Sequence, residues 1–305
     1  MKLCTTTGAL EPYTASAPET VRCFEGTGFR LLDFNFYRVR QKNSPFLSEE
    51  WKEWIQSICA AGDQLGVSFV QAHSPDGNCM ADPEERKQLI FATNRCIHAC
   101  ALMGIPNLVV HPGTAEGAGY DRFLTENSAY FQALYPAMEE YGVNVLIENS
   151  AEQNMPNRPF FFTGQEMKDF LDHMNHPLLH ACWDTGHANM RGMDQYESMT
   201  VLGQHLRAVH IQDNMGAADE HLAPMMGTCD MDEILTALLD IGFSGPFTFE
   251  ADNLLLKGGG WPHRRKVWRE DGKLQTPSLE LARKSIGLLY EIGKFLLSAY
   301  DCYEY

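Results

Sequence analysis

Four segments of the sequence end an apolar run with a side chain that can bind a metal ion. The runs end at Glu148, Asp184, His210 and Glu250. Each run is short and rich in β-prone residues, which predicts a buried strand. Two glutamates, one aspartate and one histidine at the strand ends of one sheet suit a divalent cation such as Mn²⁺, Mg²⁺, Zn²⁺ or Co²⁺. These four residues are the predicted metal ligands.

Two further strand-like runs end at His73 and His111. Ligand-type side chains therefore recur at intervals close to one strand plus one helix. The alternative for any one of them is a polar residue that is hydrogen-bonded at a loop edge. Recurrence along the chain favours a shared site, because a parallel sheet collects its strand ends on one side.

Two loop segments add candidates of the same chemical type. In Asp184-Thr185-Gly186-His187 an imidazole follows the carboxylate at the predicted start of a helix, and glycine would let the backbone turn sharply out of the strand. Asp219-Glu220-His221 lies in the loop after the seventh predicted strand, before a turn-rich link to the next helix. The alternative for His187 is a surface histidine at a helix N-terminus.

Strand-like and helix-like segments alternate along the chain. Strands are predicted at residues 2–6, 30–34, 66–72, 107–111, 144–148, 178–184, 206–211 and 246–250. Helices are predicted at residues 18–26, 49–65, 83–103, 121–141, 163–174, 193–203, 231–241 and 278–299.

This alternation predicts an α/β fold, either a (β/α)₈ TIM barrel or a doubly wound open sheet. A closed barrel brings all strand ends to one mouth, whereas an open sheet spreads them along a line. The candidate ligands therefore favour the barrel. With no linker or change in composition, we predict a single domain over residues 1–305.

Side chains of a strand alternate between its two faces. If the ligands point toward the barrel axis, Leu146 and Cys182 do so as well. Trp183, Phe247 and Phe249 should then pack outward against the helices.

The composition narrows the class of partner. The chain has 305 residues, 44% hydrophobic and 21% charged, as in soluble globular proteins, and its formal net charge is −16. Such acidity counts against nucleic acid as the main partner. Nine cysteines without a CxxC pair predict reduced thiols in the cytoplasm. The start of the chain has no signal-peptide pattern, and no apolar run is long enough for a membrane span, so no membrane partner is expected.

A long segment after the eighth strand, residues 253–277, is glycine-hinged and locally basic. On a barrel it would overhang the mouth, where it could act as a lid or bind a phosphate or carboxylate. The alternatives are a solvated loop or a subunit contact, which leaves a homo-oligomer open. Residues 37–40 are a second basic candidate.

Several motifs together resemble the xylose isomerase-like TIM-barrel superfamily, which includes sugar and sugar-phosphate isomerases and epimerases, inosose dehydratases and endonuclease IV. The resemblance extends roughly over residues 73–250. The motifs are Val109-Val110-His111-Pro112-Gly113, Ile147-Glu148-Asn149, Asp184-Thr185-Gly186-His187, His210-Ile211-Gln212-Asp213, Asp219-x-His221 and Phe249-Glu250.

The resemblance implies that Glu148, Asp184, His210 and Glu250 bind one divalent metal, and that the two glutamates also move protons. A metal that holds a carbonyl and an adjacent hydroxyl lowers the pKa of the C–H bond between them. One carboxylate would remove this proton and the other would return it. Return to the opposite face gives an epimer, and return to the neighbouring carbon gives an aldose–ketose isomer.

The resemblance also assigns His187, His73 and His111 to substrate binding, with His187 contacting a substrate oxygen. One feature departs from the ketose 3-epimerases, which usually carry an arginine a few residues after the metal-binding histidine of strand seven. Residues 211–218 contain no arginine.

A second resemblance is to the ligand set of endonuclease IV, which holds three zinc ions and hydrolyses phosphodiesters. Asp219 and His221 would be additional metal ligands in that arrangement. Many sugar-active relatives retain some of the same residues. The full set would be His73, His111, Glu148, Asp184, His187, His210, Asp219, His221 and Glu250.

The sequence therefore predicts a metal-dependent isomerase or epimerase of a sugar, sugar phosphate or cyclitol. The alternatives are an inosose dehydratase-like lyase, an endonuclease IV-like zinc phosphodiesterase, and a non-catalytic binding protein that keeps the pocket. The expected partner is a small sugar or polyol. Its identity and the number of metal ions stay open.

Overall fold

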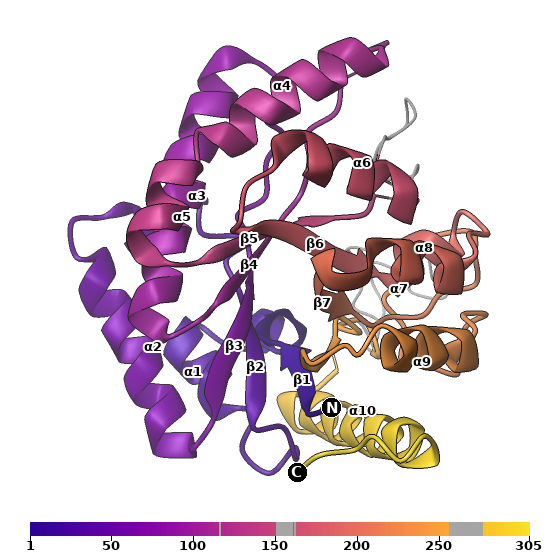
Figure 1. The fold of residues 1–305 in the computed structure, drawn as a ribbon. Coiled ribbons are helices and arrows are strands. Elements are labelled where there is room, and N and C mark those ends of the chain that lie inside the picture. The colour runs from indigo at the N-terminus through magenta and orange to yellow at the C-terminus, as the bar shows by residue number, and fades with distance from the viewer. Residues whose placement is uncertain (116, 151–160, 162, 256–276) are drawn as a thin grey trace, which may run out of the picture.

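Parallel strands alternate with helices along the chain in the computed structural model (Figure 1). The structure describes residues 1–115, 117–150, 161, 163–255 and 277–305. The predicted lid or subunit contact at 253–277 lies outside these residues, apart from its two ends.

Within the described residues, eight strands form one sheet in the order β7-β6-β5-β4-β3-β2-β1-β8. The strands are β1 (Leu3–Thr6), β2 (Leu31–Asn35), β3 (Ser68–His73), β4 (Asn107–Val110), β5 (Asn144–Glu148), β6 (Leu179–Asp184), β7 (Leu206–His210) and β8 (Phe247–Phe249).

The sheet closes between β7 and β8. A parallel bridge joins Ile211 to Phe249. The Ile211 N–H donates to the Thr248 carbonyl at 2.7 Å, and the Glu250 N–H donates to the Ile211 carbonyl at 3.1 Å. The closed sheet confirms the predicted (β/α)₈ barrel and excludes the doubly wound open sheet.

Helices surround the strands (Figure 1). They are α1 (Ala17–Arg22), α2 (Trp51–Leu65), α3 (Pro83–Met103), α4 (Tyr120–Gln132), α5 (Tyr135–Tyr141), α6 (Gly164–Met174), α7 (Thr185–Asn189), α8 (Gln195–Leu202), α9 (Met231–Asp240) and α10 (Leu279–Ala299). Among the described residues, no helix has the length and apolarity needed to cross a membrane.

The single helix predicted at 121–141 is wrong, because two helices, α4 and α5, occupy this stretch. Pro136 lies in the first turn of α5. Proline has no N–H to donate within a helix and is tolerated in the first turn, so it favours a new helix start here.

The barrel has two separate apolar layers. A small cluster inside the sheet consists of Val109, Leu146, Cys182 and Ala208. Trp183, together with Phe247 and Phe249, belongs to the large cluster that also contains the buried faces of the helices. The predicted alternation is confirmed, and it aims the ligand-type side chains at the barrel axis.

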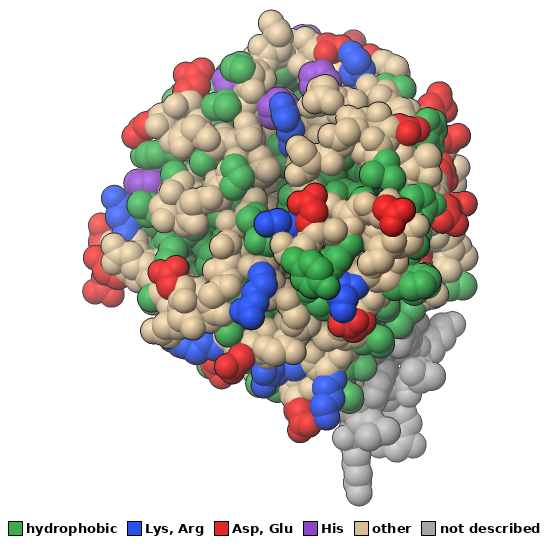
Figure 2. Space-filling model, turned by 60° about the horizontal axis from the view of Figure 1, so that its bottom comes forward, with side chains coloured by type: hydrophobic (Ala, Val, Ile, Leu, Met, Phe, Trp, Pro, Cys, Tyr) green, Lys and Arg blue, Asp and Glu red, His purple; other side chains and the backbone are tan. Residues whose placement is uncertain are grey.

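On the face shown in Figure 2, Asp and Glu side chains lie among Lys and Arg side chains, with hydrophobic side chains between them. Both signs of charge are mixed there, as on an ordinary solvent-exposed surface.

Candidate metal centre

The four predicted ligands come together at the carboxyl ends of neighbouring strands. Glu148, Asp184 and His210 are the last residues of β5, β6 and β7, and Glu250 follows β8 directly. Strand register places Asp184 beside His210. One ligand atom from each of the four residues lies within 4.8 Å of those of the other three.

His210 lies between the two glutamates. Its Nδ1 atom is 2.6 Å from Glu148 Oε1 and 3.2 Å from Glu250 Oε2. The Glu148 and His210 side chains are buried, whereas the Glu250 side chain is 17% exposed. Glu250 is therefore the most exposed of the four predicted ligands.

The donor set fits a divalent cation. Three carboxylates and one imidazole nitrogen are ligands for Mn²⁺, Mg²⁺, Zn²⁺ or Co²⁺. Burial raises the pKa of Asp184 to about 7, and the negative charges of Glu148, Glu250 and Asp219 add to this rise although His187 opposes it. Buried carboxylates that repel one another in this way are stabilised by a positive ion between them.

The glutamates are nevertheless ionised near neutral pH. Burial by itself would raise the pKa of Glu148, but His210 and His111 hold it well below its ordinary value. Burial also acts against ionisation of Glu250, and His210 lowers its pKa to about 2. Both side chains can therefore accept a proton.

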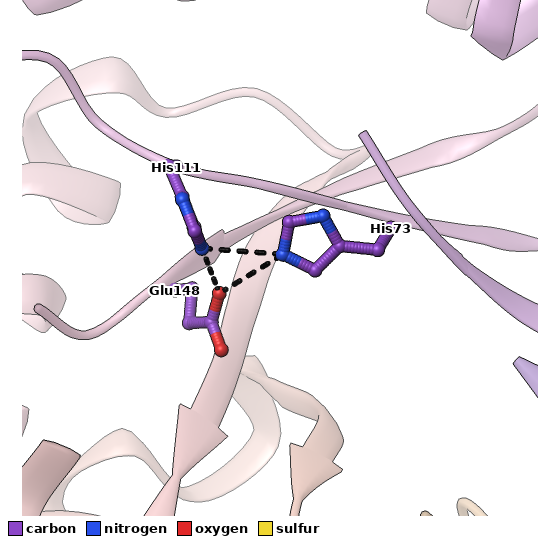
Figure 3. A group of neighbouring side chains, drawn as sticks. All are labelled: His73, His111 and Glu148. Carbon is purple, nitrogen blue, oxygen red and sulfur yellow. Dashed lines mark hydrogen bonds and ion pairs between the residues drawn. The ribbon is translucent and has the colours of Figure 1, made fainter. Parts of the chain in front are cut away.

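A second group lies against the other oxygen of Glu148 (Figure 3). His111 Nε2 is 2.5 Å and His73 Nε2 is 3.6 Å from Glu148 Oε2. His73 Nδ1 donates to the Ser74 carbonyl at 3.0 Å, which leaves Nε2 facing the carboxylate. Glu148 is thus shared by both groups.

A third group lies on the side of Asp184. His187 Nε2 and His221 Nε2 are 3.4 and 3.2 Å from Asp219 Oδ2. The His187 backbone N–H donates to Asp184 Oδ1 at 2.6 Å, so the carboxylate caps α7. The imidazole is oriented by its Nδ1, which donates to the Asn149 carbonyl at 2.8 Å. The structure therefore brings all nine predicted residues to one mouth.

Sequence reasoning assigned no role to several polar residues that hold these ligands. Asn149 accepts from the Asp184 N–H at 2.6 Å and donates to the Asp184 carbonyl at 2.9 Å. Gln212 Nε2 donates to Asp219 Oδ1 at 2.6 Å and lies 3.3 Å from Asp184 Oδ1. Both residues follow a predicted ligand within two positions. Their place near a strand end was therefore the sequence feature that could have indicated a role at the site. Asp252, 3.2 Å from His221 Nδ1, is of the same kind.

Gly186 provides space for Gln212. The predicted reason, a sharp backbone turn, is wrong, because Gly186 lies within α7 and is not among the glycines with positive φ. A Cβ atom at this position would lie 2.2 Å from the Gln212 side chain.

Replacing Gly186 with alanine should push Gln212 away from Asp184 and Asp219. We expect Mn²⁺ to bind about 10-fold more weakly, and the free energy of unfolding to fall by about 1–3 kcal/mol. Calorimetric titration and thermal unfolding measure these effects. Gly287→Ala in α10 is the matched control, since its nearest contact is 3.9 Å away. Equal effects of both substitutions would contradict this role of Gly186.

Metal affinity should depend on pH. The pKa of Asp184 is about 7 without a metal, and although burial lowers the pKa of His210, Cys182, Glu250 and Glu148 raise it well above its usual range. A cation must displace these protons, so affinity should fall as the pH drops, by about tenfold per pH unit for each displaced proton. Titration with Mn²⁺ between pH 6 and 8, in buffers of different ionisation enthalpy, counts the protons released. An affinity that is constant over this range would contradict the expectation.

A family model described as "Xylose isomerase-like TIM barrel" matches residues 25–276. A ketose 3-epimerase of Arthrobacter globiformis is 27% identical over 223 residues, covering 69% of this chain and 70% of that protein. A probable endonuclease 4 of Citrifermentans bemidjiense is 27% identical over 190 residues, covering 55% of this chain and 65% of that protein. The chain spans between 50% and 76% of the length of the curated relatives that it matches.

Solved structures show the same fold. A D-psicose 3-epimerase from Clostridium cellulolyticum H10, solved with D-tagatose, superposes with a TM-score of 0.76 at 18% identity. The superposition covers 97% of this chain and 99% of that chain.

Proposed function

The chain belongs to the xylose isomerase-like TIM barrel family, and from this premise we propose that it is a divalent-metal-dependent isomerase or epimerase of a sugar, sugar phosphate or cyclitol. The observation that carries the proposal is the pair of ionised carboxylates, Glu148 and Glu250, on either side of His210. The similarity to a ketose 3-epimerase supports the same chemistry.

In this proposal the four ligands Glu148, Asp184, His210 and Glu250 hold the cation. When bound, the cation would draw electrons from a substrate carbonyl and make the adjacent C–H bond more acidic. One glutamate accepts the proton from carbon, and the electron pair of that bond moves onto the carbonyl oxygen to give an enediolate. The other glutamate takes up a proton from solvent and donates it to the opposite face of the enediolate, which completes epimerisation, and the first glutamate then releases its proton to solvent.

The surrounding side chains prepare the two glutamates for this task. His111 and His210 contact Glu148 at 2.5 and 2.6 Å and hold it in one orientation. His187 is buried beside Asp184 and Asp219, and we assign its imidazole to a substrate oxygen. His73 and His111 would contact the substrate from the other side.

Return of the proton to the neighbouring carbon would instead give isomerisation, and loss of a hydroxyl from the enediolate would give the lyase reaction.

Incubation of the Mn²⁺-loaded protein with a panel of sugars, sugar phosphates and cyclitols in deuterated water tests the proposal. Deuterium should enter one substrate at the carbon next to its carbonyl, as mass spectrometry and proton NMR can measure. Exchange in none of these classes, with the metal bound, would overturn the proposal.

A second candidate function is a zinc phosphodiesterase. It is favoured by the two histidine groups that flank the four ligands, with Glu148 shared by one of them and Asp184 next to the other. The similarity to a probable endonuclease 4 points the same way. The formal net charge of −16 counts against a polyanionic substrate. The number of bound ions separates the two candidates.

A further inference from the structure

A chain of polar side chains crosses the barrel interior beneath His210. It consists of Asp33 on β2, Gln71 on β3 and Thr248 on β8. Their exposed fractions are 1%, 0% and 0%. Burying a polar group at this depth destabilises the folded protein unless the group is hydrogen-bonded.

Each member of the chain orients the next. The Thr248 hydroxyl donates to Gln71 Oε1 at 3.4 Å, and Gln71 Nε2 donates to Asp33 Oδ2 at 3.1 Å. The same Asp33 oxygen lies 3.3 Å from His210 Nε2. A carboxylate oxygen accepts hydrogen bonds, so the nitrogen of His210 that faces it is the donor.

This contact decides which nitrogen of His210 is free. A neutral imidazole has one N–H donor and one lone-pair acceptor. In the neutral form that can bind a cation, the hydrogen on Nε2 leaves the lone pair on Nδ1, the atom that faces Glu148 and Glu250. Histidines that bind metals usually donate their other N–H to a carboxylate or carbonyl in this way.

The backbone of β2 supports the placement of Asp33. The pairing of β2 with β3 shifts its register between Leu32 and Asp33. Such an irregularity re-aims a side chain. Among the described residues, Asp33 Oδ1 is buried without a hydrogen-bond partner. The carboxylate therefore depends on its Oδ2 contacts with His210 and Gln71.

We propose that Asp33 is a positioning residue for the metal centre, which fixes the tautomer and ring orientation of His210. This inference rests on the proposed function in one respect, that His210 is a metal ligand. Asp33 itself acts through His210 and belongs to none of the three ligand groups.

The test compares Mn²⁺ binding by calorimetry in three variants. Asp33→Ala should weaken binding by about 10- to 100-fold, because neither nitrogen of His210 is then specified as the donor. Asp33→Asn is nearly isosteric and keeps an oxygen that accepts from Nε2–H, so it should recover part of this loss. Thr248→Val breaks the far end of the same chain without touching Asp33 or His210, so it should weaken binding less than Asp33→Ala does.

Nitrogen-15 NMR of the histidine side chains gives a readout that is independent of bound metal and of activity. The His210 signal is identified by its loss in His210→Asn. At a pH high enough for this imidazole to be neutral, it should show the Nε2–H tautomer in the metal-free protein and a mixture of both tautomers in Asp33→Ala. If the unmodified protein binds Mn²⁺ and both Asp33 variants bind it equally well, the positioning role is wrong and the proposed function stands. If the unmodified protein binds no divalent cation, the proposed function is overturned together with this inference.

Discussion

Replacing Glu148 or Glu250 with glutamine is expected to reduce turnover by about 100- to 10,000-fold, the usual contribution of general acid–base catalysis. Glutamine has nearly the same shape as glutamate but cannot take up a proton from carbon. The His210 Nδ1 contacts of both glutamates, at 2.6 and 3.2 Å, place them on the same reaction centre. Turnover is measured with the substrate found in the deuterium-exchange panel.

The two variants should differ in a second measurement. The variant that keeps the proton-abstracting glutamate can still exchange the substrate hydrogen with deuterated water, although it forms little product. The other variant should lose both exchange and turnover. This separation is expected only when one carboxylate removes the proton and the other returns it.

Both glutamates are also proposed metal ligands, so the bound metal must be measured in each variant by elemental analysis. Glu139→Gln provides the control, because Glu139 is 66% exposed and contacts the imidazole of His176 at 3.2 Å, away from the mouth. This substitution should leave turnover unchanged. Full turnover in either active-site variant would exclude the two-carboxylate mechanism.

Removal of bound metal by a chelator should abolish turnover and destabilise the protein. Without the cation, the buried carboxylates of Glu148, Asp184 and Glu250 repel one another, and this repulsion adds to the rise that burial gives the pKa of Asp184. Relative to protein with free metal at a thousand times its Kd, the free energy of unfolding should be lower by about 4 kcal/mol. Thermal unfolding with and without chelator measures this difference.

Re-addition of Mn²⁺, Co²⁺, Mg²⁺ or Zn²⁺ one at a time should restore turnover with the ion that the site uses. The same samples give the number of ions per chain. One ion favours the isomerase or epimerase, whereas two or three favour the phosphodiesterase. Asp219→Ala should leave the count unchanged in the first case and lower it in the second. Full turnover by protein that elemental analysis shows to be free of metal would exclude metal dependence.

Much of the site was predictable because its signals are local. To predict a ligand-type residue at the end of an apolar run, one needs only the two-residue period of a strand and the position where the strand ends. Leu146 inside the sheet and Trp183 outside it confirm that period. Pro136 was also a local signal, but the apolar pattern of residues 121–141 continues across it and favoured one helix where there are two.

Asp33 and Gln212 could not be assigned a role from the sequence. A single acidic residue within a strand is compatible with many environments, and an amide near a strand end is common. Their roles depend on the groups that face them. Asp33 and His210 are 177 residues apart and meet across the barrel interior.

The sequence by itself determined the alternation of strands and helices and which ligand-type side chains end the strands, because both follow from patterns within single segments. It also carried the resemblance to the family, which the family match confirms. Only the tertiary structure decided that β7 meets β8, that the predicted ligands form three adjoining groups, and that Asp33 lies under His210. These are contacts between distant segments, and closure of the barrel brings them together.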